Sequence, residues 1–223
     1  MSAGDGSGAK LAGFVHRYEP AAVSGAPTVL LLHGTGADEN DLLPLGRALA
    51  SDAALLSPRG RVSEHGAPRW FRRYDEGVFD TEDLVRRTHE LAEFVTAACE
   101  HYRRDPTTVF AAGFSNGANI AASTLLLHPG KLRAALLFAP MLPFSEPDRV
   151  DLSGAGVFIA AGRSDPIAPA DQADELARQL SDRGANVALN WHPGGHGIDE
   201  DVLRAAQSWL RKLRQSIAVD PVP

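Results

Sequence analysis

A serine flanked by two glycines stands between an apolar run and a stretch of small residues. The segment Gly113–Gly117 reads Gly-Phe-Ser-Asn-Gly; the strand-forming residues Val109–Ala112 precede it and a stretch of helical character follows. In a strand-to-helix context, G-x-S-x-G places its serine on a tight turn with the hydroxyl exposed. Side chains at the two glycine positions would clash with the neighbouring strand and helix. The pattern therefore predicts that Ser115 is a nucleophile.

A serine hydroxyl is a weak nucleophile unless a base takes its proton. The expected chain order on this kind of sheet is serine, acid, histidine, and three histidines follow Ser115: His128, His192 and His196. His128 falls at the far end of the helix that starts at the serine. His192 ends the last predicted strand, whereas His196 lies in a glycine-rich loop from which its side chain can reach across the sheet edge. His196 is the favoured base, with His192 as the alternative.

The acid that orients this histidine has several candidates. Asp165 directly follows a buried strand and precedes a proline, so its loop is short and fixed. Asp171 and Asp174 are typical of acids in the first turn of a helix, where the helix dipole favours them in solvent. Asp148 and Asp151 lie near the end of the preceding loop and are the fallback. Asp165 is the preferred acid.

An oxyanion hole needs two hydrogen-bond donors that point at the developing negative charge. On this kind of sheet they are the N–H after the nucleophile, here Asn116, and an N–H from the loop after an early buried strand. The segment His33-Gly34-Thr35-Gly36 is that loop, and the Thr35 N–H is the expected donor. His33 precedes Ser115 in the chain and is interpreted as a structural hydrogen-bonding residue.

The elements that must position these residues alternate between strands and helices. Because the strands lack alternating polarity, they indicate an α/β fold with a mostly parallel, doubly wound sheet covered by helices on both faces. The carboxyl ends of such strands share one edge, where all the candidate residues fall. Strands are expected at about residues 14–18, 28–33, 53–57, 109–112, 132–139, 156–161 and 186–191, and helices at about 40–51, 80–102, 116–128, 169–182 and 199–213. A single domain is predicted over residues 13–217, with a disordered tail at 1–12 and a frayed tail at 218–223.

Composition excludes several classes of function. The chain has 223 residues, 44% of them hydrophobic, which is enough for one full core. Its formal charge of -6 argues against a nucleic-acid partner. One cysteine, Cys99, excludes an internal disulfide and is expected to be a buried thiol. No signal peptide, membrane-inserting segment or metal-ligand spacing is evident. A cytoplasmic protein without a bound metal is expected.

Four motifs together resemble one family. Leu32–Gly36, Gly113–Gly117, Gly162–Pro166 and Gly195-His196 are similar to those of α/β-hydrolases of the phospholipase/carboxylesterase group, which includes the acyl-protein thioesterases and small bacterial carboxylesterases. The match covers residues 28–212. It implies a serine hydrolase that needs no cofactor, acts on a small-molecule ester and is often a homodimer.

Further stretches resemble the bacterial branch of this group that is linked to hydroquinone and catechol stress. They are Ser57–Gly60, Trp70–Arg73 and Glu76–Asp80. One departure concerns the substrate, because acyl-protein thioesterases usually carry Gln after the nucleophile and this chain has Asn116. The favoured function is hydrolysis of short-acyl or aryl carboxylic esters. The alternatives are a non-catalytic binder of small ligands, a thioesterase or lysophospholipase with the same residues, and a dienelactone-type lactonase, against which Ser115 counts because lactonases commonly use Cys.

Residues lining the substrate groove are expected in two segments that follow strands. Only about 16 residues separate Ala139 from Gly156, too few for a helical cap, so an open groove that favours short acyl groups is predicted. The groove residues of this segment are Met141, Leu142 and Phe144. The loop from residue 58 to 80 is rich in arginine. In one interpretation Arg72 or Arg73 holds an anionic or phenolic part of the substrate, with Trp70 and Phe71 stacking beside it; in the other, the arginines pair with acids of the loop.

Overall fold

The computed structural model describes residues 9–219, with side chains from residue 11 to residue 217. The predicted tail residues 1–8 and 220–223 lie outside the described residues. In chain order the elements are β1 (Ala9–Leu11), β2 (Phe14–Glu19), β3 (Thr28–Leu32), α1 (Leu43–Leu49), β4 (Ala54–Pro58), β5 (Val62–Glu64), β6 (Ala67–Arg69), β7 (Arg73–Asp75), β8 (Val78–Phe79), α2 (Thr81–His101), a 3-10 turn (Pro106–Thr108), β9 (Val109–Phe114), α3 (Asn116–Leu127), β10 (Ala134–Phe138), β11 (Gly156–Gly162), α4 (Ala170–Ser181), β12 (Asn186–His192) and α5 (Glu200–Val219).

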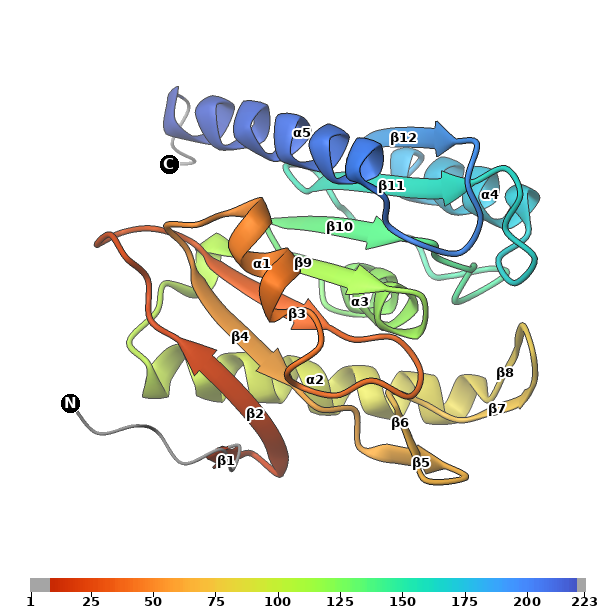
Figure 1. Ribbon diagram of the computed structural model, residues 1–223, viewed down its shortest axis with the longest axis horizontal. Helices are drawn as coiled ribbons and strands as arrows, with labels where there is room; N and C mark the ends of the chain where they lie inside the picture. The colour runs from red at the N-terminus through yellow and green to blue at the C-terminus, as the bar shows by residue number, and fades with distance from the viewer. Residues whose placement is uncertain (1–8, 220–223) are drawn as a thin grey trace.

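One eight-stranded sheet runs through the molecule in the order β1-β2-β4-β3-β9-β10-β11-β12. The six strands from β4 to β12 in this order are parallel, and β1 and β2 are antiparallel additions at one edge. The carboxyl ends of the parallel strands therefore face the same side, on the right in Figure 1. The predicted α/β-hydrolase fold, with a mostly parallel sheet, is confirmed.

Helices cover both faces of the sheet. Helices α1 and α5 lie on one face, and α2, α3 and α4 on the other (Figure 1). Strand β3 shows why its sequence is apolar throughout: Leu30 and Leu32 pack into the core beneath α2 and α3, while Val29 and Leu31 pack into the core beneath α1. Neither face of such a strand is exposed to solvent, so its sequence does not alternate between polar and apolar residues. The segment between β10 and β11 contains no helix, so no large cap covers the sheet edge.

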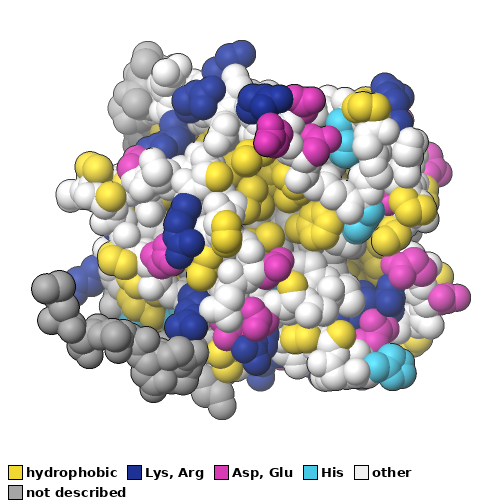
Figure 2. All heavy atoms as spheres, in the orientation of Figure 1, with side chains coloured by type: hydrophobic (Ala, Val, Ile, Leu, Met, Phe, Trp, Pro, Cys, Tyr) yellow, Lys and Arg dark blue, Asp and Glu magenta, His cyan; other side chains and the backbone are white. Residues whose placement is uncertain are grey.

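The face that carries α1 and α5 has an apolar hollow. Figure 2 shows hydrophobic side chains in the hollow between these helices and on toward the carboxyl end of β9. Partly buried residues that pack against the core on this side of the sheet include Leu45, Phe114, Ile198 and Leu203. Within residues 9–219, no helix combines the length and apolar character needed to cross a lipid bilayer.

The ends of the domain differ from the prediction. Residues 9–11, assigned to a disordered tail, form β1, which pairs antiparallel with β2. A three-residue strand is too short to show a pattern, and backbone pairing alone defines it. At the other end α5 continues to Val219, beyond both the predicted helix end at 213 and the predicted domain end at 217. Helix α1 begins at Leu43 instead of near residue 40, because Asp38 accepts the Asn40 N–H in a preceding turn.

The arginine-rich segment after β4 is also more ordered than the loop that was predicted. It contains two antiparallel hairpins, β5–β6 and β7–β8. Their strands are two or three residues long, below the length at which hydrophobic periodicity is informative.

A buried carboxylate attaches these hairpins to α2. The Asp83 side chain is fully buried; it accepts the Arg72 N–H at 2.8 Å and pairs with the guanidinium groups of Arg86 and Arg87. Burial by itself would raise the pKa of Asp83, but the Arg72 N–H and the two arginines outweigh it and hold this pKa below its ordinary value. The ionised form of Asp83 therefore stabilises the fold.

The substitution Asp83→Asn is expected to lower the free energy of unfolding by about 1–3 kcal/mol at neutral pH, because charge-assisted hydrogen bonds are lost. In the wild type, the ionised Asp83 carboxylate contributes fully to the free energy of unfolding above its unfolded-state pKa of about 3.9. This contribution is lost as the pH falls through the lower folded-state pKa of Asp83. Chemical denaturation of both proteins from pH 7 to pH 3 measures the difference. If the difference in unfolding free energy between the two proteins is the same at pH 7 and pH 3, the ionised Asp83 carboxylate does not stabilise the fold.

Candidate active site

Ser115 occupies the sharp turn between β9 and α3. Its backbone has φ 52° and ψ -116°, a left-handed conformation that is strained for a residue with a side chain. The Ser115 N–H donates to the Phe138 carbonyl on the neighbouring strand β10 at 2.8 Å, which holds the turn against the sheet. The hydroxyl is thereby presented at the carboxyl edge.

The two glycines of the motif are required by close backbone contacts. A Cβ on Gly113 would lie 2.5 Å from the Gly117 carbonyl oxygen, and a Cβ on Gly117 would lie 1.9 Å from the carbonyl oxygen of Leu32, the last residue of β3. Both distances are shorter than any real Cβ contact. The first turn of α3 therefore passes directly over the end of β3.

The structure brings Ser115, His196 and Asp165 into one hydrogen-bonded series. His196 Nε2 lies 2.9 Å from Ser115 Oγ, and His196 Nδ1 lies 2.7 Å from Asp165 Oδ2. The Asp165 side chain is 1% exposed, and its Oδ1 accepts the N–H groups of Ile167 and Ala168 at 2.8 and 3.0 Å. Both carboxylate oxygens are therefore fixed, and the contact of Oδ2 with His196 Nδ1 leaves the other ring nitrogen, Nε2, directed at Ser115 Oγ.

The two alternative bases, His192 and His128, contact other residues. His192 is buried at the end of β12, where its carbonyl accepts the Arg163 N–H at 2.8 Å and its ring packs against Gly194. His128, at the end of α3, lies 2.8 Å from the ring of His89 on α2.

The alternative acids do not contact His196 either. Asp151 accepts the Ser153 N–H in a surface turn. Asp148, Asp171 and Asp174 are exposed, the last two on α4.

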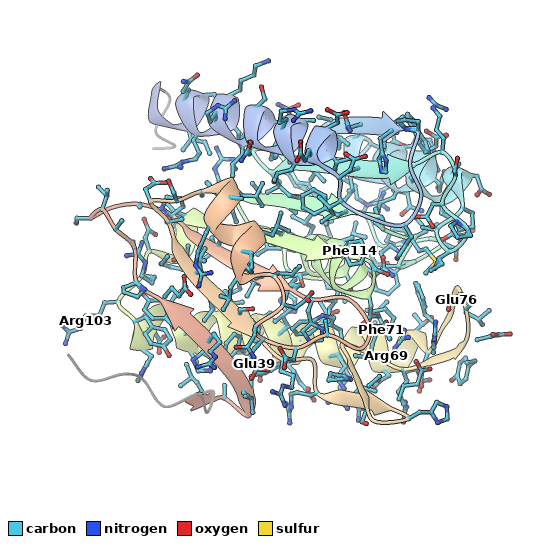
Figure 3. All side chains as sticks on the ribbon, viewed as in Figure 1. Glu39, Arg69, Phe71, Glu76, Arg103 and Phe114 are labelled. Carbon is cyan, nitrogen blue, oxygen red and sulfur yellow. The ribbon has the colours of Figure 1, made fainter. Side chains whose placement is uncertain are left out.

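The two expected oxyanion donors lie on adjacent segments. Asn116 is the first residue of α3, and the first N–H groups of a helix have no partner within it. The loop that holds Thr35 packs against the same turn, because a Cβ on Gly34 would lie 2.9 Å from the ring of Phe114. Figure 3 labels Phe114 at the end of β9. Its ring centroid lies 5.1 Å from that of His196.

His33 fixes the peptide that carries the Thr35 N–H. Its Nε2 accepts the Gly60 N–H at 2.9 Å, so the proton of the neutral ring is on Nδ1, which donates to the Gly34 carbonyl at 2.7 Å. In a trans peptide the N–H is directed opposite to the C=O, so the Thr35 N–H points away from the His33 ring. Burial lowers the pKa of His33, which favours this neutral form.

The predicted role of Trp70 and Phe71 in stacking on the substrate does not agree with their positions. They are only 2% and 0% exposed and belong to the core beneath α2 and α3. The Trp70 indole N–H donates to the His33 carbonyl, and Phe71 packs edge-on against Phe79. Figure 3 shows Phe71, which follows β6, beside Arg69 at the end of that strand. The two rings are core residues that hold the hairpins on the domain.

Arg72 and Arg73 are paired with acids of their own segment. Arg72 contacts Asp80 at 2.8 Å, and Arg73 contacts Glu64 at 3.1 Å and also pairs with Glu76. These contacts favour the structural interpretation of the arginine-rich segment over a role in holding the substrate.

The three residues after β10 occupy different environments. Met141 is 4% exposed; its N–H donates to Asn119 Oδ1 at 2.8 Å, and its sulfur faces Gly77 of the β7–β8 hairpin. Leu142 is partly buried, and its N–H donates to Gln172 of α4. Phe144 lines a small concavity beside Leu126 and Leu127, at the end of α3 opposite to Ser115. This position does not agree with the predicted place of Phe144 in the substrate groove.

Asn119 is a positioning residue that the sequence analysis missed. It is 1% exposed on α3, and its amide fixes the backbone just after β10. The signal was present in the sequence, because Asn119 is a second amide side chain, after Asn116, in a helix of mostly apolar residues.

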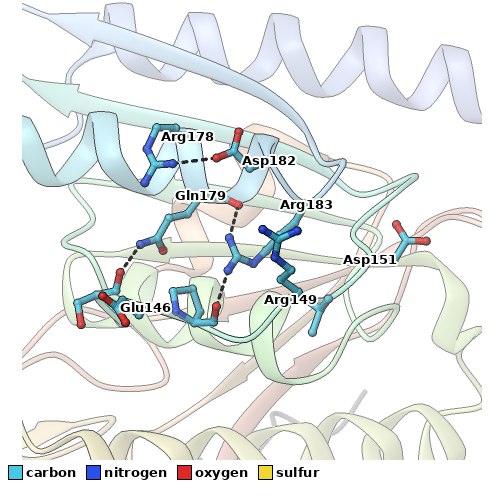
Figure 4. Close-up of a pocket in the computed structure, with 10 residues that line it drawn as sticks. Glu146, Arg149, Asp151, Arg178, Gln179, Asp182 and Arg183 are labelled. Atoms are coloured by element: carbon cyan, nitrogen blue, oxygen red, sulfur yellow. Dashed lines mark hydrogen bonds and ion pairs between the residues drawn. The ribbon is translucent and has the colours of Figure 1, made fainter.

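A concavity of about 930 Å³ lies away from these residues, between residues 145–151 and the C-terminal half of α4 (Figure 4). Arg178 pairs with Asp182 across its wall, and Arg183 donates to carbonyls of the loop. Ser115, Asp165 and His196 do not line it. Among the described side chains, no group of three or more His, Cys, Asp or Glu residues is arranged to hold a metal ion.

Comparison with known proteins gives the family. A profile of the dienelactone hydrolase family matches residues 72–210. MhqD of Bacillus subtilis, which is named as a hydrolase, is 45% identical over 184 residues that cover 82% of this chain and 92% of MhqD. The chain belongs to the dienelactone hydrolase family.

Solved structures agree with this assignment. The chain resembles a carboxylesterase of Bacillus cereus, with 43% identity, a TM-score of 0.88 and coverage of 90% of this chain and 94% of the other. A carboxylesterase of Mesorhizobium loti is 33% identical with a TM-score of 0.86, covering 92% and 97% of the two chains. The relatives confirm the resemblance drawn from the motifs, and the protein is an enzyme, a hydrolase.

The substitution Gly117→Ala is expected to destabilise this hydrolase by about 3 kcal/mol or more, because the new methyl group would displace α3 from β3. Gly197→Ala is the matched control, since nothing lies within 4 Å of a Cβ at that position. Thermal unfolding of both variants measures the difference. Equal melting temperatures would contradict the close approach of α3 to β3.

Proposed function

We propose that the protein is a serine carboxylesterase that hydrolyses short-acyl or aryl carboxylic esters through an acyl-enzyme intermediate. The observation that carries this proposal is the unbroken series Ser115 Oγ, His196 and Asp165, with separations of 2.9 and 2.7 Å. Such a series is the arrangement that activates a serine hydroxyl.

In the acylation half, Ser115 Oγ attacks the ester carbonyl carbon while His196 Nε2 takes the hydroxyl proton. The carbonyl oxygen becomes an oxyanion, which the N–H groups of Thr35 and Asn116 stabilise, aided by the positive end of the α3 dipole. The protonated His196 then gives its proton to the leaving alkoxide or phenoxide as the tetrahedral intermediate collapses. The products are the free alcohol or phenol and an ester of Ser115.

In the deacylation half, water replaces the alcohol. His196 takes a proton from the water as it attacks the acyl carbon, and the same two N–H groups hold the second oxyanion. Collapse returns the proton to Ser115 Oγ and releases the carboxylic acid. Asp165 keeps its charge throughout and stabilises the imidazolium of His196.

Two alternatives are less well supported. A non-catalytic binding protein would not require a hydrogen-bonded series from serine to histidine to aspartate. In this chain the series is complete, and both carboxylate oxygens of Asp165 accept hydrogen bonds. A lactonase mechanism of the cysteine type lacks its nucleophile, because Ser occupies position 115 and Cys99 is buried in α2, where burial raises the pKa of its thiol. A small-molecule ester remains the proposed substrate; a homodimer and a cytoplasmic location remain predictions from the sequence.

Ser115→Ala is expected to reduce kcat by about a million-fold without loss of folded protein, because the hydroxyl is the group that forms the acyl-enzyme. Hydrolysis of p-nitrophenyl acetate and covalent labelling with a fluorophosphonate measure this. His196→Ala should be comparably damaging and His192→Ala mild. Asp165→Asn should cost about 10⁴-fold and Asp151→Asn little. Labelling that persists in Ser115→Ala would place the nucleophile elsewhere.

Acyl-chain preference follows from the absence of a cap between β10 and β11. Esters with about two to four acyl carbons, whose acyl chains contain about zero to two methylene groups to bury, should give the highest kcat/KM. A series of p-nitrophenyl esters from acetate to palmitate measures the preference, with Ser115→Ala as the background control. Rates that rise steadily to palmitate would show a deep acyl channel instead.

A further inference from the structure

Trp70 donates both of its N–H groups to the two segments that carry the proposed oxyanion donors. Its backbone N–H donates to Asn116 Oδ1 at 2.8 Å, and its indole N–H donates to the His33 carbonyl at 2.8 Å. These partners are 46 and 37 residues away in the chain. One residue thus connects the nucleophile turn, through its backbone, with the loop after β3, through its side chain.

Each connection acts close to an oxyanion donor. Asn116 supplies its own N–H, so the bond to its side chain fixes the residue whose backbone faces the oxyanion. His33 lies two residues before Thr35, and its ring orients the Gly34–Thr35 peptide. The distance between the two donors therefore depends on where Trp70 holds these segments.

The surroundings of Trp70 leave it little freedom to move. The residue is 2% exposed, and its ring centroid lies 5.1 Å from that of His33. A Cβ on Gly60 would lie 2.4 Å from the Arg69 carbonyl oxygen, so the chain just before Trp70 is pressed against the residue that donates to His33 Nε2. Glu39, in the segment after Thr35, is buried and paired with Arg59. Several contacts therefore hold the hairpin segment against the loop after β3.

Such rigidity matters for catalysis more than for binding. Donors that stabilise an oxyanion act through fixed placement, because no free energy is then spent on reorienting them as charge develops. A displacement of about 1 Å in a reacting constellation can lower the rate by about 100-fold. Binding of the neutral ester depends on these donors much less.

We propose that Trp70 is a positioning residue for the oxyanion hole, which sets the spacing of the Thr35 and Asn116 N–H groups through its two hydrogen bonds. This role rests on the proposed serine esterase function. It assigns to the β5–β6 hairpin segment a part in transition-state stabilisation, although Trp70 has almost no surface that a substrate could contact.

The test is Trp70→Phe, which keeps an aromatic ring and the backbone N–H but removes the indole donor to the His33 carbonyl. Phe94→Leu is the matched control, because Phe94 is fully buried in the same core and its ring packs against Phe14 and His16. Both variants and the wild type are compared in p-nitrophenyl acetate hydrolysis, with active sites counted by the end point of fluorophosphonate labelling, and in thermal unfolding.

The expected result is a fall in kcat of about 10- to 100-fold for Trp70→Phe with KM within about threefold of the wild-type value. Phe94→Leu should lower the melting temperature while kcat per labelled site stays at the wild-type value. If Trp70→Phe is destabilised but keeps the wild-type kcat, Trp70 is only a core residue and the proposal is overturned. A rise in KM alone would also overturn it, since that pattern belongs to a group that contacts the substrate.

A second variant covers the case in which Trp70→Phe does not fold. Asn116→Ala removes the acceptor of the Trp70 backbone N–H but keeps its own backbone donor, and the same loss of kcat at unchanged KM is expected. Wild-type kcat in Asn116→Ala would then overturn the proposal. Failure of the proposed function has a different signature, because the wild type itself would neither hydrolyse the ester nor be labelled at Ser115.

Discussion

The contact between the first turn of α3 and the end of β3 is the constraint on which the rest of the site depends. There is no space for a methyl group between Gly117 and the Leu32 carbonyl, where a Cβ would lie at 1.9 Å. This proximity forces the chain to reverse within a single residue, and Ser115 takes the left-handed conformation as a result. The same proximity brings the loop after β3 beside the nucleophile. In the proposed mechanism, two segments far apart in the chain therefore act on one oxyanion.

The sequence was sufficient to predict the features that depend on local pattern. Buried strands such as β3, β9 and β10 are continuous apolar runs, and the carboxyl-edge rule then groups Ser115, Asp165 and His196 on one side of the sheet. The edge strand β1 and the two hairpins were missed because each strand has only two or three residues, and long-range packing decides their pairing. Periodicity carries no signal at that length.

The residues predicted to line the groove show a second limit. Trp70 and Phe71 stand in a segment rich in arginine and glycine, which fits an exposed aromatic surface as well as a buried one. Their burial follows from how the hairpins fold onto α2, with Asp83 holding the Arg72 N–H. The arginines were ambiguous for the same reason, because Glu64 and Asp80 become their partners only in three dimensions. Composition gives the number of charges in a segment but not their pairing.

The order of the site along the chain has a consequence for its synthesis. His196 follows Ser115 by 81 residues and Asp165 by 31. During translation the strained turn at Ser115 leaves the ribosome well before its base, and β12, which leads to His196, can pair only with the already formed edge of β11. In the proposed mechanism, Ser115 therefore stays without its base until β12 and the loop that follows it have been made. In the proposed mechanism, ester hydrolysis can begin only after β12 has paired with β11 and His196 has reached Ser115.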